Sequence, residues 1–147
     1  MIIKFKKLDP RACLPMKSTA GSSGFDLFAL FSTNVPYLRL DPGNSFIFNT
    51  GISLEIPPGW EGQVRSRSGL AAKHGLFVLN SPGTIDSDYR GEIKVILTNL
   101  SGKAYDIRNL EKIAQLVFQE VPNVQLVEVE NLNATQRGEG GFGSTGK

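Results

Sequence analysis

Short apolar segments separated by turn residues run along most of the chain. Turn signals such as Asp41-Pro-Gly-Asn44 and Pro57-Pro-Gly59 interrupt them. Residues 20–27 lead into a further short apolar segment that ends near Phe31. The pattern predicts strands over residues 1–7, 37–40, 45–49, 51–56, 61–67, 77–80, 93–99 and 125–129. Many short strands with glycine and proline between them are typical of an all-β barrel or sandwich.

Helix signals are sparse, and the best ones lie over residues 68–74. Ser68 is a candidate N-cap and Gly75 stands just past the end, so we predict a helix of about two turns there. Residues 113–121 are ambiguous, because Ala-Gln-Leu suits a helix and Val-Phe-Gln-Glu-Val suits a strand. The surrounding strands favour a strand.

The C-terminal segment differs in composition from the rest of the chain. From Glu130 onward the apolar residues are reduced to Leu132, Ala134 and Phe142 among glycine and polar residues. Such a segment cannot bury a core of its own. We therefore predict a β-barrel core domain over residues 1–130 and a flexible C-terminal arm over residues 131–147.

The amino-acid composition of the chain excludes several classes of function. The net charge of +2 supplies no long-range field for a nucleic-acid backbone, so no nucleic-acid partner is expected. Cys13 is the single cysteine and His74 the single histidine, which excludes a disulfide framework, Cys-His catalysis by any ordinary route and multi-histidine metal sites. No apolar run approaches a membrane span and the N-terminus has no signal-peptide pattern, so we expect a cytoplasmic protein.

Residues 80–92 carry the densest group of functional side chains. Gly83 and Gly91 bracket two carboxylates, an aromatic ring and a cation, namely Asp86, Asp88, Tyr89 and Arg90. Glycines let the backbone turn tightly and approach a ligand closely. The stretch is therefore a candidate site on a rigid frame, and the alternative is a plain hairpin turn.

Two further segments could bind anions. Arg67, Ser68 and the backbone of Gly69 stand at the start of the predicted helix, where unpaired N–H groups favour a phosphate; a capped surface helix is the alternative. In the tail, Phe142 could cover an aromatic ring. The tail residues Arg137, Ser144 and Thr145 could bind phosphates. The tail lacks the order of a P-loop, and a linker or disordered end is its alternative.

Five segments occur in one order along the chain: Ser23-Gly-Phe-Asp-Leu27, Arg67-Ser-Gly-Leu-Ala71, Gly83-Thr-Ile-Asp-Ser-Asp-Tyr-Arg-Gly-Glu92, Lys112-Ile-Ala-Gln-Leu116 and Arg137-Gly-Glu-Gly-Gly-Phe-Gly-Ser-Thr-Gly146. Together they resemble the five motifs of the homotrimeric dUTPases, the deoxyuridine 5′-triphosphate nucleotidohydrolases. The third and fifth segments are the most specific. Lys112 departs from the family, which usually has arginine there, so it receives no ligand role.

The resemblance implies a jelly-roll-like β fold and a homotrimer with shared active sites. It also implies that dUTP and water give dUMP and pyrophosphate through attack at the α-phosphorus, which limits uracil incorporation into DNA and supplies dUMP for thymidylate synthesis. Asp86 matches the catalytic aspartate that orients the water and takes its proton. The phosphate ligands implied are Arg67, Ser68, the Gly69 backbone, Gln115 and Arg137.

The remaining implied roles concern the nucleoside, the lid and the metal. The backbone of Gly83, Thr84 and Ile85, with Asn80 nearby, would read uracil, and Tyr89 would pack under the deoxyribose and exclude a ribose. Phe142, Gly143, Ser144 and Thr145 would close over a neighbouring site with the arm. Mg²⁺ would be held mainly by the triphosphate and waters, with Asp26 touching its shell through water or pairing with Arg67. Asp88 and Arg90 would be structural, pairing across the turn or the subunit interface.

Two alternatives remain at this point. The related dCTP deaminases share the fold, although the intact third and fifth segments favour the hydrolase. A nucleotide-dependent regulatory protein without catalysis is the other alternative. Every expected catalytic position is filled in this chain, which weighs against that second alternative.

Overall fold

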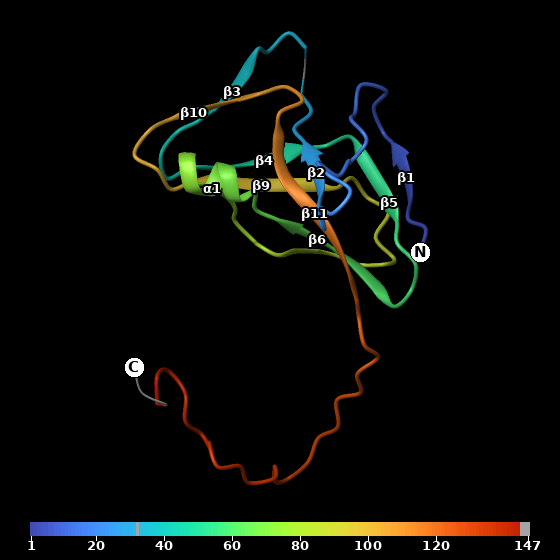
Figure 1. The fold of residues 1–147 in the computed structure, drawn as a ribbon, viewed down its shortest axis with the longest axis vertical. Coiled ribbons are helices and arrows are strands. Elements are labelled where there is room, and N and C mark those ends of the chain that lie inside the picture. The colour runs from blue at the N-terminus through green and yellow to red at the C-terminus, as the bar shows by residue number, and fades with distance from the viewer. Residues whose placement is uncertain (32, 145–147) are drawn as a thin grey trace.

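The chain folds into antiparallel strands with one short helix among the residues that the structure describes (Figure 1). The computed structural model describes residues 1–31 and 33–144. The elements in order are β1 (Lys4–Lys7), β2 (Phe25–Phe28), β3 (Tyr37–Leu40), β4 (Ser45–Asn49), β5 (Ile52–Glu55), β6 (Trp60–Arg65), α1 (Ser68–His74), β7 (Leu76–Val78), β8 (Gly83–Ile85), β9 (Lys94–Asn99), β10 (Tyr105–Arg108) and β11 (Lys112–Glu120). Within the described ranges, no helix is long and apolar enough to cross a lipid bilayer.

Two sheets and two paired ribbons build the body. The larger sheet has the strand order β2-β11-β6-β8 and the smaller one β4-β9-β7, while β1 pairs with β5 and β10 with β3. Every one of these pairings is antiparallel. Most neighbours in the sheets are far apart in sequence, as in a jelly-roll-like sandwich.

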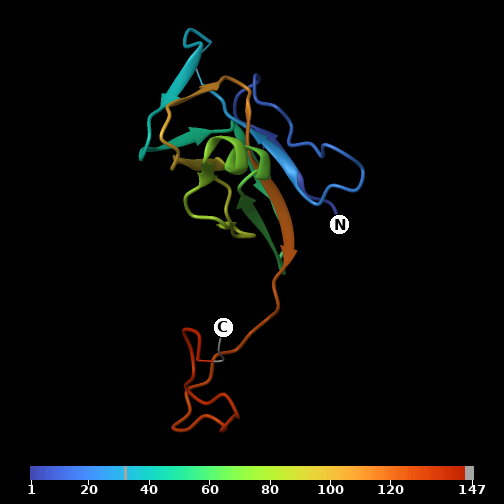
Figure 2. The same ribbon diagram turned by 60° about the vertical axis from the view of Figure 1, so that its left-hand side comes forward.

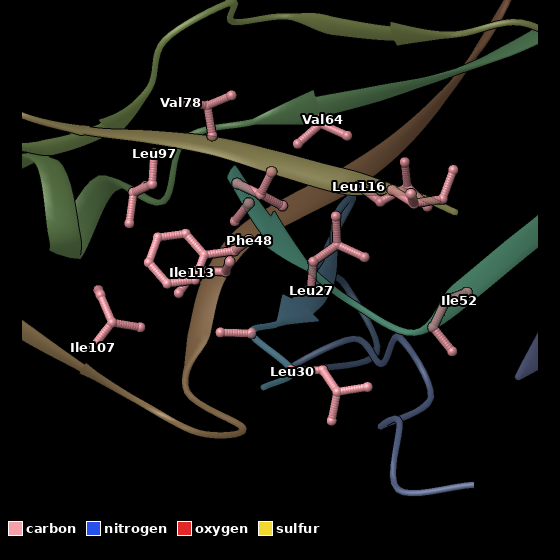
Figure 3. Packing of buried hydrophobic residues seen from close by; sticks show 14 of the residues in the cluster. Leu27, Leu30, Phe48, Ile52, Val64, Val78, Leu97, Ile107, Ile113 and Leu116 are labelled. Carbon is pink, nitrogen blue, oxygen red and sulfur yellow. The ribbon is translucent and has the colours of Figure 1, made fainter. Parts of the chain in front are cut away.

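The core lies between the sheets and consists mainly of aliphatic side chains with Phe48 among them. Figure 3 shows Phe48, Leu97 and Ile113 together between the strands, and each has at most 1% of its surface exposed. Burial alternates along the second half of β6, as expected for a strand with one face on a core, whereas Ile113 and Ala114 at the start of β11 are both buried. Burying one such side chain stabilises the fold by about 1.5–3 kcal/mol.

The stretch over residues 80–92 is not a plain hairpin turn. Strands β7 and β9 on its two sides do pair, with Phe77 opposite Thr98. Between them, however, the chain crosses to the other sheet, where β8 pairs with β6 and Thr84 lies opposite Gln63. The stretch therefore connects the two sheets, and its backbone is held by β6.

The predicted helix is confirmed over Ser68–His74, and its start differs in detail. Arg67 is the N-cap, with φ −90° and ψ 126°, and its side chain makes no capping hydrogen bond. Ser68, predicted as the N-cap, is the first helical residue. Gly75 ends the helix as predicted, in the left-handed region at φ 64°. The first N–H groups of α1 therefore have no side-chain cap.

Two other segments test the strand predictions. Residues 113–120 of the ambiguous segment belong to strand β11, which lies between β2 and β6 and must follow their pleat; Val121 lies just past its end. The strand predicted over residues 125–129 is wrong: the segment is extended chain outside any ladder, and Leu126 is 93% exposed. Strand β10 was not predicted at all. The chain after β11 leads away from the body in both views (Figures 1 and 2).

Candidate functional site

Arg67 is fixed where β6 gives way to α1. Its Nε lies 3.2 Å from Oδ1 of Asp26 on β2. Its Nη1 donates a hydrogen bond of 2.8 Å to the backbone carbonyl of Lys112 on β11. Contacts with β2 and β11 therefore fix the orientation of the guanidinium. The start of α1, which has no side-chain cap, follows Arg67 directly.

Asp26 lies at the centre of a cluster of polar side chains that also includes Ser18, Arg67 and Lys112. Its side chain is only 10% exposed, and Oδ2 accepts from Lys112 Nζ and from Ser18 Oγ, each at 2.8 Å. Burial alone would raise the pKa of Asp26, but hydrogen bonds from Lys112 and Ser18 and the charge of Arg67 outweigh it and lower the pKa. Asp26 is therefore held ionised, and the ion pair with Arg67 that the sequence suggested is present.

Gln115 joins the same cluster through a glycine. Its Nε2 donates to the carbonyl of Ser66 at 3.0 Å, and strand pairing places it opposite both Arg65 and Asp26. A Cβ on Gly24 would lie 2.3 Å from Oε1 of Gln115. The glycine in the first of the five segments is thus required for the glutamine to lie where it does.

A second group of residues forms a pocket beside β8. The pocket has a volume of about 340 Å³ and is lined by Ile47, Asn80, Thr84, Ile85, Asp86, Tyr89, Glu92, Lys94 and Ile96. The side chain of Asn80 packs against Gly83, where its Nδ2 would lie 3.1 Å from a Cβ. Isoleucines and an exposed strand backbone can bind a flat heterocycle by its face and its polar edge.

Tyr89 lies at one side of this pocket with its ring over Gly91. A Cβ on Gly91 would lie 2.3 Å from the Tyr89 hydroxyl, which donates to the carbonyl of Glu92 at 3.0 Å. Arg90 Nη1 donates to the carbonyls of Ser87 and Tyr89, at 2.6 and 2.9 Å. Arg90 thus contacts backbone carbonyls of the turn itself; the sequence predicted that Arg90 and Asp88 are structural and pair across the turn or the subunit interface.

Asp86 is exposed between two hollows. It lines the pocket beside β8 and also a wider pocket of about 650 Å³ with Trp60, Glu61 and Asp88. The side chain is reached from solvent on both sides, so a water molecule can approach it directly. A carboxylate in this position can orient water for attack on a ligand in either pocket.

Asp86 and the cluster around Asp26 lie towards different ends of β6, since Asp86 lines a pocket with Trp60 and Glu61. Ile85 pairs with Gly62, whereas Gln115 pairs with Arg65. These β6 residues are separated by ~10 Å along the strand, and Arg67 lies beyond Arg65. Asp86 and Arg67 of the same chain therefore do not face one small ligand.

The arm residues that the structure describes lie away from both groups. Arg137 Nε donates to the carbonyl of Gly140 at 2.8 Å, and Phe142 is fully exposed. Gly143 has φ 92°, in the region that favours glycine, and Ser144 is exposed. Thr145, also named from the sequence, lies outside the described residues. Figure 1 shows the arm directed away from the sheets.

Two residues of the cluster were not assigned from the sequence. Ser18 lies in an irregular, proline-containing connection with no local signal for a partner. Lys112 has no ligand role in the sequence-based prediction, because lysine lacks the bidentate geometry of arginine. For a metal site, the described ranges hold no group of three or more acidic, histidine or cysteine side chains. A Mg²⁺ ion would therefore need most of its oxygen ligands from a bound phosphate and waters.

Known proteins with similar sequences belong to one family. The sequence profile of the dUTPase family matches residues 11–146. The deoxyuridine 5′-triphosphate nucleotidohydrolase of Nautilia profundicola is 50% identical over 147 residues, which cover 100% of both chains. That of a Hydrogenobaculum species is 53% identical over 146 residues, 99% of each chain.

A solved structure shows the same fold. The dUTPase of Staphylococcus bacteriophage 80alpha with dUPNHPP superposes with a TM-score of 0.87 and 26% identity, over 99% of each chain. The all-β, jelly-roll-like fold with one short helix, expected from the sequence, is confirmed.

Proposed function

The chain belongs to the dUTPase family, and we infer from this that it is a dUTP diphosphatase that hydrolyses dUTP to dUMP and pyrophosphate. The observation that carries the inference to this chain is the pocket beside β8. There an exposed strand backbone, a tyrosine and a carboxylate meet. This combination suits the recognition of a nucleoside next to an activated water.

We assign Asp86 as the catalytic base. Its carboxylate would orient a water and take its proton during attack at the α-phosphorus. No covalent nucleophile is needed. The charge of the transition state is spread over phosphate oxygens, so stabilisation by cations and N–H groups is the main requirement. Arg67, Ser68, the Gly69 backbone and Gln115 supply such groups in the cluster around Asp26.

We assign the choice of base and sugar to the pocket beside β8. Backbone groups of Gly83, Thr84 and Ile85 can pair with the N3–H and carbonyls of uracil, and cytosine would leave such groups unpaired. The ring of Tyr89, supported by Gly91, packs under the deoxyribose and leaves no room for a ribose hydroxyl. Asn80, packed on Gly83, braces this backbone.

Mg²⁺ fits this arrangement as a partner of the substrate. It would supply charge neutralisation on the triphosphate, and Asp26 is the side chain assigned to its water shell. Both oxygens of Asp26 already have cationic or hydroxyl partners, so a contact through water fits better than direct coordination. We also propose a cytoplasmic location, which suits an enzyme of nucleotide metabolism whose only cysteine, Cys13, is free.

We propose that three chains assemble and share their active sites. The separation of Asp86 from Arg67 along β6 supports this, because a second chain can bring its Arg67 cluster to the Asp86 pocket of the first. The segment after β11 also exposes apolar side chains, with Val124 67%, Leu126 93% and Val127 70% exposed. Such a segment is stabilised by burial against a neighbouring chain.

Sedimentation equilibrium should accordingly give three times the mass of the chain. Replacing Leu126 by Asp should shift the equilibrium towards smaller species, because a charge would have to be buried at the contact. As a matched control, Glu128→Asp keeps the charge of its site and should leave the mass unchanged. A purely monomeric wild-type protein that is fully active would contradict the shared site.

Release of pyrophosphate from four nucleotides tests the proposed reaction. With Mg²⁺ present, dUTP should be hydrolysed, and dCTP, dTTP and UTP should react more slowly by about 10²-fold or more. Equal turnover of all four would contradict the roles of β8 and Tyr89. Release of ammonia from dCTP would instead identify a deaminase. Nucleotide binding without pyrophosphate release would identify a regulatory protein.

A further inference from the structure

Lys112 makes two contacts that the proposed roles do not explain. Its Nζ lies 2.8 Å from Oδ2 of Asp26, and its backbone carbonyl accepts the hydrogen bond from Nη1 of Arg67. The side chain is 37% exposed and its Nζ lies 6.0 Å from the centre of the Phe28 ring. One residue thus contacts both members of the Asp26–Arg67 ion pair.

The strand register produces this arrangement. Lys112 lies opposite Phe28, but the pairing of β11 with β2 is shifted by one residue between Lys112 and Ala114. Because of this shift, Gln115 rather than Ala114 lies opposite Asp26. A β-bulge re-aims the side chains around it. The irregularity at the start of β11 therefore gathers Lys112, Gln115 and Asp26 in one place.

The charges of the cluster indicate what Lys112 does. A carboxylate that is 10% exposed and paired with Arg67 alone would cancel most of the positive charge of the guanidinium. Lys112 adds a second cation to the same carboxylate, so the cluster keeps one positive charge in excess. Among the residues that the structure describes, Nη2 of Arg67 donates no hydrogen bond, and the side chain is 33% exposed.

We propose that Lys112 is a positioning residue for phosphate binding. It holds Asp26 so that Asp26 anchors Arg67 while the cluster keeps a net positive charge. The proposal rests on the proposed function and deepens it. It also explains why lysine serves at a position where the family usually has arginine. Contact with one oxygen of Asp26 needs only the point charge of the ammonium, and the contact with Arg67 uses the backbone carbonyl, so neither contact needs the planar fork of arginine.

Steady-state kinetics of Lys112→Met, compared with wild type over a range of ionic strength, tests this role. The KM for dUTP should rise on the order of tenfold, because the field at the phosphates is weakened. The dependence of kcat/KM on salt should become shallower, since one cation near a polyanion is lost. A purely structural role would leave that salt dependence unchanged.

Three further variants make the test specific. Lys112→Arg keeps the charge and should restore KM and the salt dependence nearly to wild type. Lys112→Gln removes the charge with a polar side chain and should behave like Lys112→Met, which guards against a folding defect in the latter. Lys103→Met removes an exposed cation on the β9–β10 connection and should match wild type. Unchanged KM and salt dependence in both neutral Lys112 variants would overturn the proposal.

Calorimetric titration with inorganic pyrophosphate separates this proposal from the proposed function. Wild type should bind pyrophosphate on the order of tenfold more tightly than Lys112→Met, in the absence of any nucleotide. Equal binding would refute the role of Lys112 while leaving hydrolysis of dUTP untouched. A wild-type protein that binds pyrophosphate in this charge-dependent way but releases none from dUTP would refute the proposed function alone.

Discussion

Asp86→Asn is expected to slow the hydrolysis of dUTP by about 10²–10⁴-fold, because an amide cannot take a proton from water. Binding of dUTP should be retained, since the substitution preserves shape and the base contacts come from the backbone of β8. Single-turnover rates and equilibrium binding of dUTP would measure the two effects separately.

A neighbouring carboxylate provides the control for Asp86. Asp88→Asn removes the same charge two residues away, in the wider pocket only, and should retain most of the activity. If the two variants lost activity equally, the effect would come from the charge of the turn and not from a base. Near-normal turnover of Asp86→Asn would remove Asp86 from the catalytic role.

Removal of residues 137–147 is the second change with a large expected effect. It should lower kcat/KM for dUTP by about 10²-fold or more, because Arg137, Phe142, Gly143 and Ser144 would no longer close over the bound nucleotide. The melting temperature should stay the same. In the described part of the arm, Arg137 and Gly138 donate hydrogen bonds to Gly140 and Thr135, which also belong to the arm.

The truncated protein also provides a complementation test. Mixed with the Asp86→Asn protein, it should recover activity in exchanged trimers, because one chain would supply the base and another the arm. Unchanged kinetics after truncation would refute the arm as a lid. Absence of recovery in trimers shown to be mixed would contradict an arm that acts on a neighbouring chain.

Local patterns were sufficient for most elements. Strands β3 and β4 and helix α1 lie at the predicted residues, because each is bounded by turn residues within a few positions and α1 ends at a left-handed glycine. Residues 125–129 have the same apolar character as these strands, and yet they form no ladder within one chain. Strand formation needs a partner, and the sequence pattern does not supply one.

Spatial relations within the site could not be predicted in this way. The crossing of β8 to β6, the ion cluster of Asp26 and the contact of Gly24 with Gln115 all join segments far apart in sequence. Lys112 illustrates the difference: its residue type argued against a ligand role, and only its position beside Asp26 indicates what it does.

The sequence by itself determined the fold class, the family resemblance and the identity of the candidate residues, since apolar periodicity, turn chemistry and the five segments are properties of neighbouring positions. The tertiary structure decided which of these residues lie together. It placed Arg67, Asp26, Lys112 and Gln115 at one end of β6 and Asp86 with Tyr89 near the other. The physical reason is that antiparallel pairing between distant strands, and its one-residue shift at Lys112, set these distances.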